Sequence, residues 1–381
     1  MKCIINGKLL LNDGVYENKA IIFDEKIKEI VLQDEINKSD YEIIDAKGNY
    51  VAPGLLDMHI HGYLGADVSD GDEDGIKKMA EGIIANGVTA WCPTTMTVSI
   101  KEIEDAFNAV RNVKNSCGYY GARIIGVNSE GPFINPSKKG AQAEEHILKP
   151  DAKFIKKHSD IVKLFTVAPE VDGAEECIKE VKKDTDVLIS MGHTNATFIE
   201  ANKGIEWGVG HTTHLFNAMT ALSHRNPGVV GSALSNDNVS IELICDTFHI
   251  DKGLFKLIAK IKGDKFCLIT DCIRAGGMPD GDYTLGGQPV HKEGIKCLMD
   301  DGTIAGSVLK LNEAVRNLYE NSDLELYEAV KCASLNPAKA LGVDNEIGSL
   351  EAGKRADIII ADEKFNILTT VLGGEIRYKG E

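Results

Sequence analysis

The chain lacks the features of an exported or membrane-bound protein. Its nine cysteines include no C-x-x-C pair, and an odd count without disulfide spacing is typical of a reducing compartment. The first residues, MKCIINGKLLLNDGVYENK, hold only short apolar stretches broken by Asn, Gly and Lys, which fits neither a signal peptide nor a membrane span. We therefore expect a cytoplasmic protein that has no membrane partner.

Positive charge is also scarce. The sequence has 42 Lys and Arg against 58 Asp and Glu, a formal net charge of −16. No run of Lys and Arg is dense enough to neutralise several phosphates of a polynucleotide, so we expect no nucleic acid partner. An anionic small molecule would have to be bound by a few local cations or by backbone N–H groups at helix starts.

Two signatures of common enzyme classes are missing as well. The chain has no G-x-S-x-G motif, which disfavours a serine hydrolase. Its glycine pairs neither follow a first strand nor open a helix with the spacing of a dinucleotide-binding fingerprint. We expect loops at these glycines, which are Gly208, Gly210, Gly276, Gly277, Gly286 and Gly287.

What the sequence does contain is a regular alternation of apolar runs and amphipathic helical patterns, as expected for a parallel sheet with right-handed crossovers. A chain of 381 residues can hold one (β/α)8 barrel of roughly 250 residues and a small companion unit. We predict an α/β protein whose TIM barrel has eight strands, in the runs LLDMHIH, VTAWCPT, ARIIGVNSE, IVKLFTVAPE, VLISMGH, GHTTHLF, SIELICDTFH and FCLITD.

The two ends of the chain differ from this middle part. Both contain short β-rich runs separated by Gly, Asn and Asp turns, with no long helical period. We therefore predict a small β-sandwich built from both termini. The expected domains are residues 1–52 plus 346–381 for the sandwich and residues 53–345 for the barrel.

Polar side chains stand at the end of nearly every predicted barrel strand. Because barrel enzymes carry out their chemistry at the carboxyl ends of the strands, these side chains should meet at one face. They are His59, His61, Thr94, Thr95, Glu130, Glu170, His193, His214, Asp246, His249 and Asp271.

Several of these residues are of the types that bind metal ions. His59 and His61 lie two apart on a strand, so both imidazoles point to the same face and can bind one ion. A single H-x-H also occurs as a pair of hydrogen-bonded core histidines, and a buried carboxylate such as Glu130 also occurs in salt bridges and helix caps. Four histidines and a glutamate at matched strand ends favour a metal site.

Asp271 ends the last predicted strand, in LITDCIR. A carboxylate at that place can accept a proton from a water that a metal activates and return it to a leaving nitrogen. The alternative is that Asp271 caps the turn that follows it.

The motifs together resemble the N-acetylglucosamine-6-phosphate deacetylases of the amidohydrolase superfamily over essentially the whole chain. H-x-H and the Gly-Lys-x-Ala-Asp tail occur in many amidohydrolases, whereas EGPF, GHTNAT, HLFNAM and RNPG are much more specific to the deacetylases. The matching stretches are APGLLDMHIHG, SEGPFINPSKKGAQ, TVAPE, MGHTNAT, THLFNAM, RNPGVVG, LITDCIRAGGMPDGDYTLGG, AGSVLKLNEAVRN, ASLNPAKALG and GSLEAGKRADIII.

The resemblance implies hydrolysis of N-acetyl-D-glucosamine 6-phosphate to D-glucosamine 6-phosphate and acetate, with Asp271 as catalytic acid and base. It implies a principal metal held by Glu130, His193 and His214, and a second ion held by His59 and His61 with Glu130 bridging. It also implies a homodimer or dimer-based tetramer, in which Arg225 reaches the neighbouring subunit's site. The contacts to the sugar phosphate and the amide that it implies are Asn217, Ala218, Arg225 and His249.

One position departs from the single-metal branch of the family. That branch has an amide pair in place of His-x-His and a histidine after the Lys-Lys-Gly run, where this chain has Gln142. We expect Gln142 to be one of the residues that contact the substrate. A second Lewis acid at His59 and His61 could polarise the acetyl carbonyl that the missing histidine would otherwise help to activate. We therefore expect one or two divalent ions per subunit, and zinc, iron, manganese and cobalt all stay open.

Two other functions compete with this interpretation. Another cyclic or N-acyl amidohydrolase would often bridge two metals with a carboxylated lysine at the end of the fourth strand, but that strand ends in TVAPE and Lys163 comes too early. A non-catalytic assembly module should have lost some of the metal ligands, whereas this chain keeps every one of them.

Overall fold

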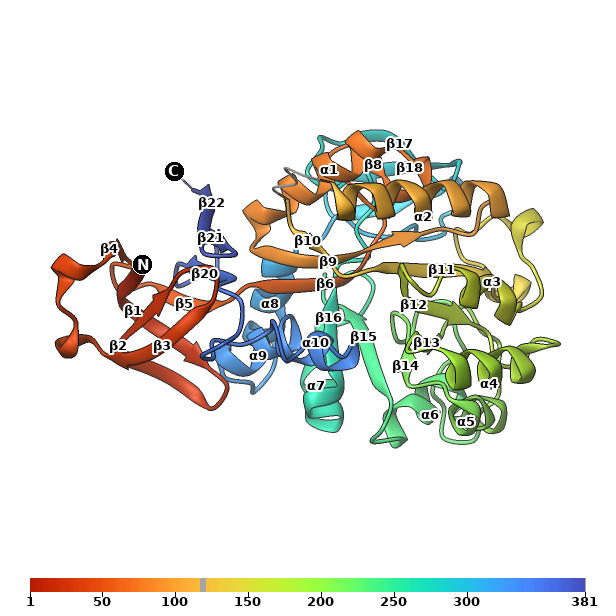
Figure 1. Ribbon diagram of the computed structural model, residues 1–381. Helices are drawn as coiled ribbons and strands as arrows, with labels where there is room; N and C mark the ends of the chain where they lie inside the picture. The colour runs from red at the N-terminus through yellow and green to blue at the C-terminus, as the bar shows by residue number, and fades with distance from the viewer. Residues whose placement is uncertain (117–120, 381) are drawn as a thin grey trace.

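The computed structural model describes residues 1–116 and 121–380 and has two units (Figure 1). The larger unit contains eight parallel strands in the order of the sequence, which confirms the predicted (β/α)8 barrel. Between the last strand and the first, an isolated parallel bridge joins Cys272 to Ile60. The strands are β6 (Leu55–Ile60), β9 (Val88–Thr95), β11 (Val127–Phe133), β12 (Val162–Val167), β13 (Leu188–Met191), β14 (His211–Thr212), β15 (Ser240–Ile244) and β16 (Phe266–Ile269).

The third predicted strand is divided in two. A short strand, β10 (Arg123–Ile124), pairs with β9 before β11 begins. Gly126 lies between them, and a Cβ atom there would come within 2.7 Å of the carbonyl oxygen of Ile161. The close approach of the neighbouring backbone explains why the run is interrupted at a glycine.

Helices cover the outside of the barrel (Figure 1). The second of them illustrates how the sequence places them: Ser99 and Glu102 form a capping box at its start, and Ile103, Phe107 and Val110 face the core at helical spacing. The helices are α1 (Glu73–Gly82), α2 (Ile100–Asn115), α3 (Ala152–Lys157), α4 (Ala174–Asp184), α5 (Phe198–Trp207), α6 (Gly228–Ser235), α7 (Phe255–Lys262), α8 (Leu311–Glu320), α9 (Leu326–Cys332) and α10 (Leu335–Ala340).

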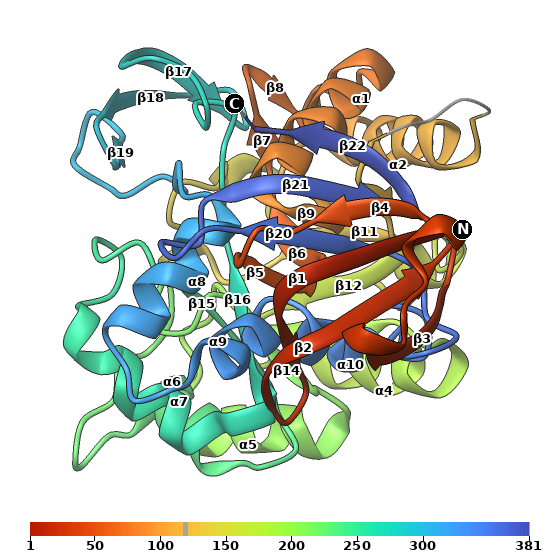
Figure 2. The same ribbon diagram turned by 90° about the vertical axis from the view of Figure 1, so that its left-hand side faces the viewer.

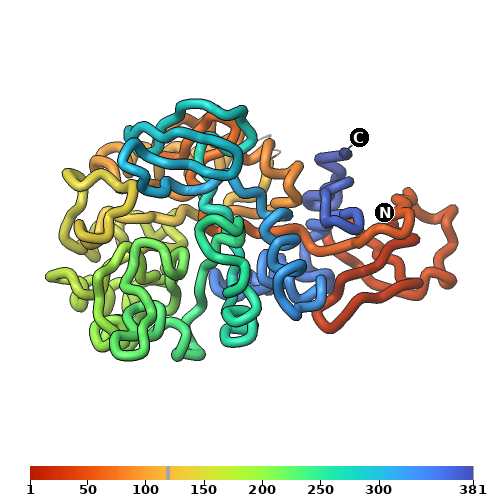
Figure 3. Tube along the Cα trace, turned by 180° about the vertical axis from the view of Figure 1, so that it is seen from behind, coloured from red at the N-terminus to blue at the C-terminus, as the bar shows by residue number. Residues whose placement is uncertain are grey.

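The smaller unit is a β structure built from both termini, as the sequence predicts. The N-terminal strands, red in Figure 2, and the C-terminal strands, blue, lie side by side, and the view from behind in Figure 3 shows the same. Hydrogen bonds link all of them into one eight-stranded sheet, in which β5 pairs with β20. They are β1 (Lys2–Leu11), β2 (Gly14–Phe23), β3 (Ile27–Leu32), β4 (Glu42–Asp45), β5 (Tyr50–Pro53), β20 (Ile358–Ala361), β21 (Ile367–Leu372) and β22 (Glu375–Lys379).

The strands of the small sheet enclose an apolar cluster of their own, which includes Ile4, Phe23, Val51, Ile358 and Val371. Strand β5 ends at Pro53 and β6 begins at Leu55, so the chain passes from the small unit into the barrel within a few residues. The division into residues 1–52 plus 346–381 and residues 53–345 stays a prediction.

A three-stranded antiparallel sheet is inserted between β16 and α8. It consists of β17 (Gly281–Leu285), β18 (Gln288–Glu293) and β19 (Lys296–Leu298). The sequence predicts only loops around its glycines, and Gly286 and Gly287 do form the tight turn between two strands, with φ of 54° and 81°. Positive φ at both central residues is what such a hairpin turn requires.

The eight cysteines in the described ranges are all buried and unpaired, while Cys117 lies outside the described residues. Among the described helices, none is both long enough and apolar enough to cross a bilayer.

Candidate active site

A cavity of about 350 Å³ opens at the carboxyl ends of the barrel strands, where the sequence places the reactive side chains. The structure brings most of the predicted site residues into its lining. Those that line it are His61, Glu130, Gln142, His193, His214, Asn217, Ala218, His249 and Asp271.

The first cluster of possible metal ligands consists of His59, His61 and Asp271, all buried. The Nε2 atoms of the two histidines lie 3.2 Å apart. Asp271 Oδ1 lies 3.2 Å from Nε2 of His61 and 3.5 Å from Nε2 of His59. The two-residue period of β6 therefore does place both imidazoles on one face, opposite a carboxylate that follows β16.

The second cluster consists of Glu130, His193 and His214. Oε1 of Glu130 lies 3.1 Å from Nε2 of His193 and 2.9 Å from Nε2 of His214. The two histidine Nε2 atoms are themselves 3.1 Å apart.

Glu130 lies between the two clusters. Its Oε2 atom is 3.4 Å from Nε2 of His61, and its Oε1 atom is 3.5 Å from Nε2 of His59. One carboxylate therefore contacts histidines of both clusters, as a bridging ligand would.

The hydrogen bonds of the histidine rings test whether these residues fit a metal ion. Nδ1 of His59 bonds a carboxylate oxygen of Glu242 at 2.9 Å. Nδ1 of His61 bonds the carbonyl of Thr94 at 3.2 Å. Nδ1 of His193 bonds the carbonyl of Lys138 at 2.9 Å. An acceptor at Nδ1 keeps the proton there and leaves the Nε2 lone pair free. Unprotonated Nε2 atoms that face each other at about 3 Å repel unless a cation lies between them, so the donor set fits a divalent ion.

The electrostatics of the cavity favour a cation. Burial lowers the pKa of His59, but Glu242 and Glu130 outweigh it and raise that pKa to about 9. Burial raises the pKa of Glu130, yet the surrounding histidines, His193 first, bring it well below its usual range. The Glu130 carboxylate therefore stays ionised although it is buried. A buried negative charge is stable only with positive charge beside it.

The backbone at three of these residues is strained. His193, His214 and Asp271 have φ of 47°, 25° and 51°, in the left-handed region that residues other than glycine rarely adopt. Each follows a barrel strand directly or within two residues. Such strain collects at functional sites, because it aims side chains where a regular strand would not.

Gln142 contacts the metal-site carboxylate directly. Its Nε2 donates to Oε2 of Glu130 at 2.6 Å, and its Oε1 accepts from the N–H of Thr97 at 2.6 Å. The residue that the sequence assigns to substrate contacts therefore also fixes the orientation of Glu130.

Other residues with predicted substrate contacts lie around the same cavity. Nδ1 of His249 bonds Asp246 Oδ2 at 2.6 Å, which leaves its Nε2 for another partner. Nδ2 of Asn217 donates to the carbonyl of His214 at 3.3 Å, and Ala218 adopts a left-handed φ of 50°.

Arg225 lies elsewhere. It is exposed and lines a separate cavity of about 540 Å³ together with Phe198, Ile199 and Pro227. In this subunit it is therefore not brought to the cavity that holds the two clusters.

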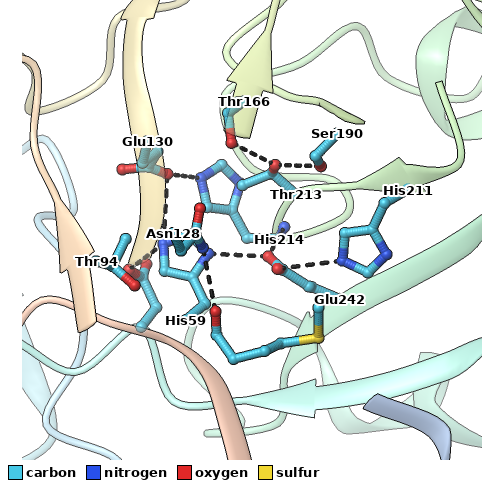
Figure 4. Close-up of polar contacts among 12 residues, drawn as sticks. His59, Thr94, Asn128, Glu130, Thr166, Ser190, His211, Thr213, His214 and Glu242 are labelled. Carbon is cyan, nitrogen blue, oxygen red and sulfur yellow. Dashed lines mark hydrogen bonds and ion pairs between the residues drawn. The ribbon is translucent and has the colours of Figure 1, made fainter. Parts of the chain in front are cut away.

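Sequence reasoning missed one residue that contacts a member of each cluster. Glu242 is buried in the middle of β15, and Figure 4 shows it between His59, His211 and His214. Glu242 lies inside a strand, whereas the predicted site residues stand at the ends of strands. The available signal was that acid itself, since SIELI would otherwise be an apolar run.

A (β/α)8 barrel with converging histidines and carboxylates at the carboxyl ends of its strands defines a class, the metal-dependent barrel hydrolases. The model of the amidohydrolase family matches residues 50–377. A curated N-acetylglucosamine-6-phosphate deacetylase of Bacillus subtilis (strain 168) is 35% identical over 98% of this chain and 93% of its own length. The chain therefore belongs to the amidohydrolase family, among its N-acetylglucosamine-6-phosphate deacetylases.

Two further similar proteins are also deacetylases of N-acetylhexosamine 6-phosphates. An N-acetylgalactosamine-6-phosphate deacetylase of Escherichia coli O157:H7 is 33% identical over 88% of this chain and 89% of its own. The crystal structure of the N-acetylglucosamine-6-phosphate deacetylase from Pasteurella multocida superposes with a TM-score of 0.93 at 30% identity and covers 100% of both chains. The family and the two ligand clusters together support a divalent metal ion at this site.

Proposed function

We propose that the chain hydrolyses the acetamide of N-acetyl-D-glucosamine 6-phosphate, releasing D-glucosamine 6-phosphate and acetate, in the breakdown or recycling of amino sugars. One observation carries the proposal: two ligand clusters that share Glu130 converge with Asp271 on one cavity. Another amidohydrolase reaction is not favoured, since the full-length relatives are deacetylases of hexosamine phosphates.

One group of site residues would hold metal ions. Glu130, His193 and His214 would hold one divalent ion, and His59 and His61 would hold a second, with Glu130 between the two. When bound, such an ion supplies the Lewis acidity that makes water nucleophilic at neutral pH and polarises a carbonyl group. Histidine and carboxylate ligands suit zinc, iron, manganese and cobalt alike.

Asp271 is the residue that moves the proton. It lines the cavity, and its carboxylate lies against His61 and His59. Burial raises the pKa of Asp271, but the contact with His61 and the charges of the histidines bring it below its usual value. It is therefore ionised, and it can take a proton from the attacking water and deliver it to the nitrogen that leaves as the amine.

The sugar phosphate would be held by the rest of the lining. Gln142, Asn217, Ala218 and His249 surround the same cavity. Arg225 lies away from it in this subunit, which suits a homodimer, or a tetramer of dimers, in which each Arg225 serves the neighbouring site. A guanidinium can bind two phosphate oxygens at once and would offset the net charge of −16 locally.

We also propose that the protein works in the cytoplasm. The eight described cysteines are buried, unpaired thiols, which suits a reducing compartment.

The experiment that tests the function is acetate release from N-acetylglucosamine 6-phosphate, compared with N-acetylglucosamine and with N-acetylgalactosamine 6-phosphate. We expect turnover that depends on a divalent ion, stops with a chelator and strongly favours the phosphorylated sugars. A protein that binds the ion but releases no acetate from any of the three would instead be a non-catalytic module.

A further inference from the structure

Glu242 is a fully buried carboxylate beside the site. Its exposed fraction is 0%, and it lies in the middle of β15. Oε2 is 2.9 Å from Nδ1 of His59 and accepts from the backbone N–H of His214 at 3.0 Å, while Oε1 lies 3.2 Å from Nε2 of His211 (Figure 4). A buried carboxylate is retained only where its partners compensate for lost hydration.

The two contacts of Oε2 belong to different clusters. His59 is part of the cluster with His61 and Asp271, and His214 is part of the cluster with Glu130 and His193. A single oxygen atom therefore touches one ligand residue of each candidate metal site.

The contact with His59 is exceptional among the cluster histidines. The rings of His61 and His193 are held at Nδ1 by neutral backbone carbonyls, whereas His59 is held there by a carboxylate. A carboxylate at Nδ1 makes the opposite nitrogen a stronger donor to a metal ion than a carbonyl does.

The contact with His214 acts through the backbone. Nδ1 of His214 is buried and has no hydrogen-bond partner among the described residues, so its ring is not held in the way that the other three are. Its backbone has the strained φ of 25°, and the N–H of that residue donates to Glu242. The carboxylate therefore fixes the place of the His214 ring by anchoring its main chain.

Glu242 contacts His211, which is in turn hydrogen-bonded to Ser240. His211 Nδ1 lies 2.6 Å from Oγ of Ser240, and that hydroxyl donates to the carbonyl of Gly210 at 3.2 Å. The Ser240 hydroxyl can accept from Nδ1 of His211 while it donates to Gly210, or it can turn and donate to Nδ1. His211 can therefore carry its proton on either nitrogen, depending on whether the group at position 242 accepts from Nε2 or donates to it.

We propose that Glu242 is a positioning residue for both metal sites: its negative charge acts on His59, and its hydrogen bond to the backbone N–H holds His214 in place. The inference rests on the proposed metal-dependent function. It assigns to β15 a role in metal binding although no residue of that strand belongs to either ligand cluster.

The variant Glu242→Gln separates charge from shape. The amide oxygen can accept from both His59 and His214, and the amide NH2 can donate to Nε2 of His211 once the proton of that ring is on Nδ1, facing Ser240. All the hydrogen bonds are then kept and only the negative charge is lost. We expect the site of His59 and His61 to lose about 10- to 100-fold in metal affinity, and the site of Glu130, His193 and His214 to change by no more than a few-fold.

The readout is a titration of the metal-free protein with Co²⁺, followed by visible absorption and by elemental analysis after gel filtration. Wild-type protein should retain two ions and Glu242→Gln one. Excess Co²⁺ should restore both the second ion and the lost kcat on N-acetylglucosamine 6-phosphate, with little change in KM. A structural role alone would not give recovery by added metal.

Ser190→Ala is the matched control. Ser190 is a buried polar residue in the same barrel interior, and its hydroxyl bonds Thr213 at 2.6 Å without touching a cluster residue (Figure 4). It should retain both ions. Two ions of unchanged affinity in Glu242→Gln, or the same loss in Ser190→Ala, would overturn the positioning role of Glu242 while leaving the proposed function intact. A wild-type protein that binds no divalent ion would overturn both.

Discussion

Gln142 holds Glu130 by a 2.6 Å hydrogen bond from its amide nitrogen, and the N–H of Thr97 holds Gln142 in turn. Glu130 touches both histidine clusters, so its orientation affects each candidate metal site. The side chain at position 142 is therefore tied to the ligands as well as to the substrate cavity.

The first prediction concerns this contact. Gln142→Met keeps the length of the side chain and removes the donor, so Glu130 loses a charge-assisted hydrogen bond worth about 1.5–3 kcal/mol. We expect kcat/KM for N-acetylglucosamine 6-phosphate to fall roughly 10- to 100-fold. Gln33→Met, at a residue that directly follows β3 in the small unit, is the control and should be unaffected. A change of less than twofold in Gln142→Met would show that Glu130 keeps its place without Gln142.

The second prediction is the number of ions. Elemental analysis of protein purified without chelators should approach two divalent ions per subunit, because five histidine and glutamate ligands exceed the three of one open catalytic site. The double variant His59→Ala, His61→Ala should retain one. A wild-type ceiling of one ion, unchanged in the double variant, would exclude the second site.

The third prediction concerns proton transfer. Asp271→Asn keeps the shape of the side chain but cannot accept a proton, so kcat should fall by about 10² or more while substrate binding persists. Steady-state kinetics and a direct binding titration measure the two effects. Asp184→Asn, a surface acid paired with Lys156, is the control. Near-normal kcat in Asp271→Asn would remove the residue from this role.

The fourth prediction concerns the phosphate group. Arg225→Ala should lower kcat/KM about 10- to 100-fold for the phosphorylated sugar only, because about 1.5–3 kcal/mol of phosphate contact is lost. Arg316→Ala, a half-buried arginine that bonds residues of the 364–366 turn, is the control. An equal loss of kcat/KM on N-acetylglucosamine 6-phosphate and on unphosphorylated N-acetylglucosamine would mean that Arg225 supports the fold or the dimer instead.

A mixing experiment tests whether Arg225 acts across subunits. Arg225→Ala and Asp271→Asn subunits are each impaired, but a hybrid dimer has one site in which both residues are intact. Refolded mixtures should therefore regain part of the activity. No recovery in mixtures shown to contain hybrids would contradict a shared site.

The fifth prediction concerns the pH dependence of stability. Lys262 is buried on α7 and donates to the carbonyls of Ala233 and Asn236, and burial lowers its pKa to about 8. The unfolded chain, with a lysine pKa of about 10.4, holds more protons than the folded chain between these values. The free energy of unfolding should therefore rise with pH over this window, by at most about 3 kcal/mol. Chemical denaturation of wild type and Lys262→Met at pH 7.5 and 10 measures the difference, and an identical pH slope in both would contradict it.

Much of the fold could be predicted because its signals are local. Each predicted barrel run contains a strand of the structure, since an apolar run of a few residues bounded by turns has few other stable conformations. The inserted sheet β17 to β19 was not predicted, because its strands are largely exposed and lack an apolar alternation. The sequence indicated a turn at Gly286 and Gly287, but it did not predict that β17 and β18 pair on either side of that turn.

The sequence by itself determined which side chains stand at the ends of the barrel strands, because a strand's alternation and its closing turn depend on neighbouring residues. The family resemblance already implied that Glu130 bridges the two clusters and that Arg225 serves a neighbouring subunit. Only the tertiary structure decided that Gln142 and Glu242 hold ligands from distant parts of the chain. These relations join residues that are many positions apart, so they depend on how eight strands close into a ring, and no local pattern records that closure.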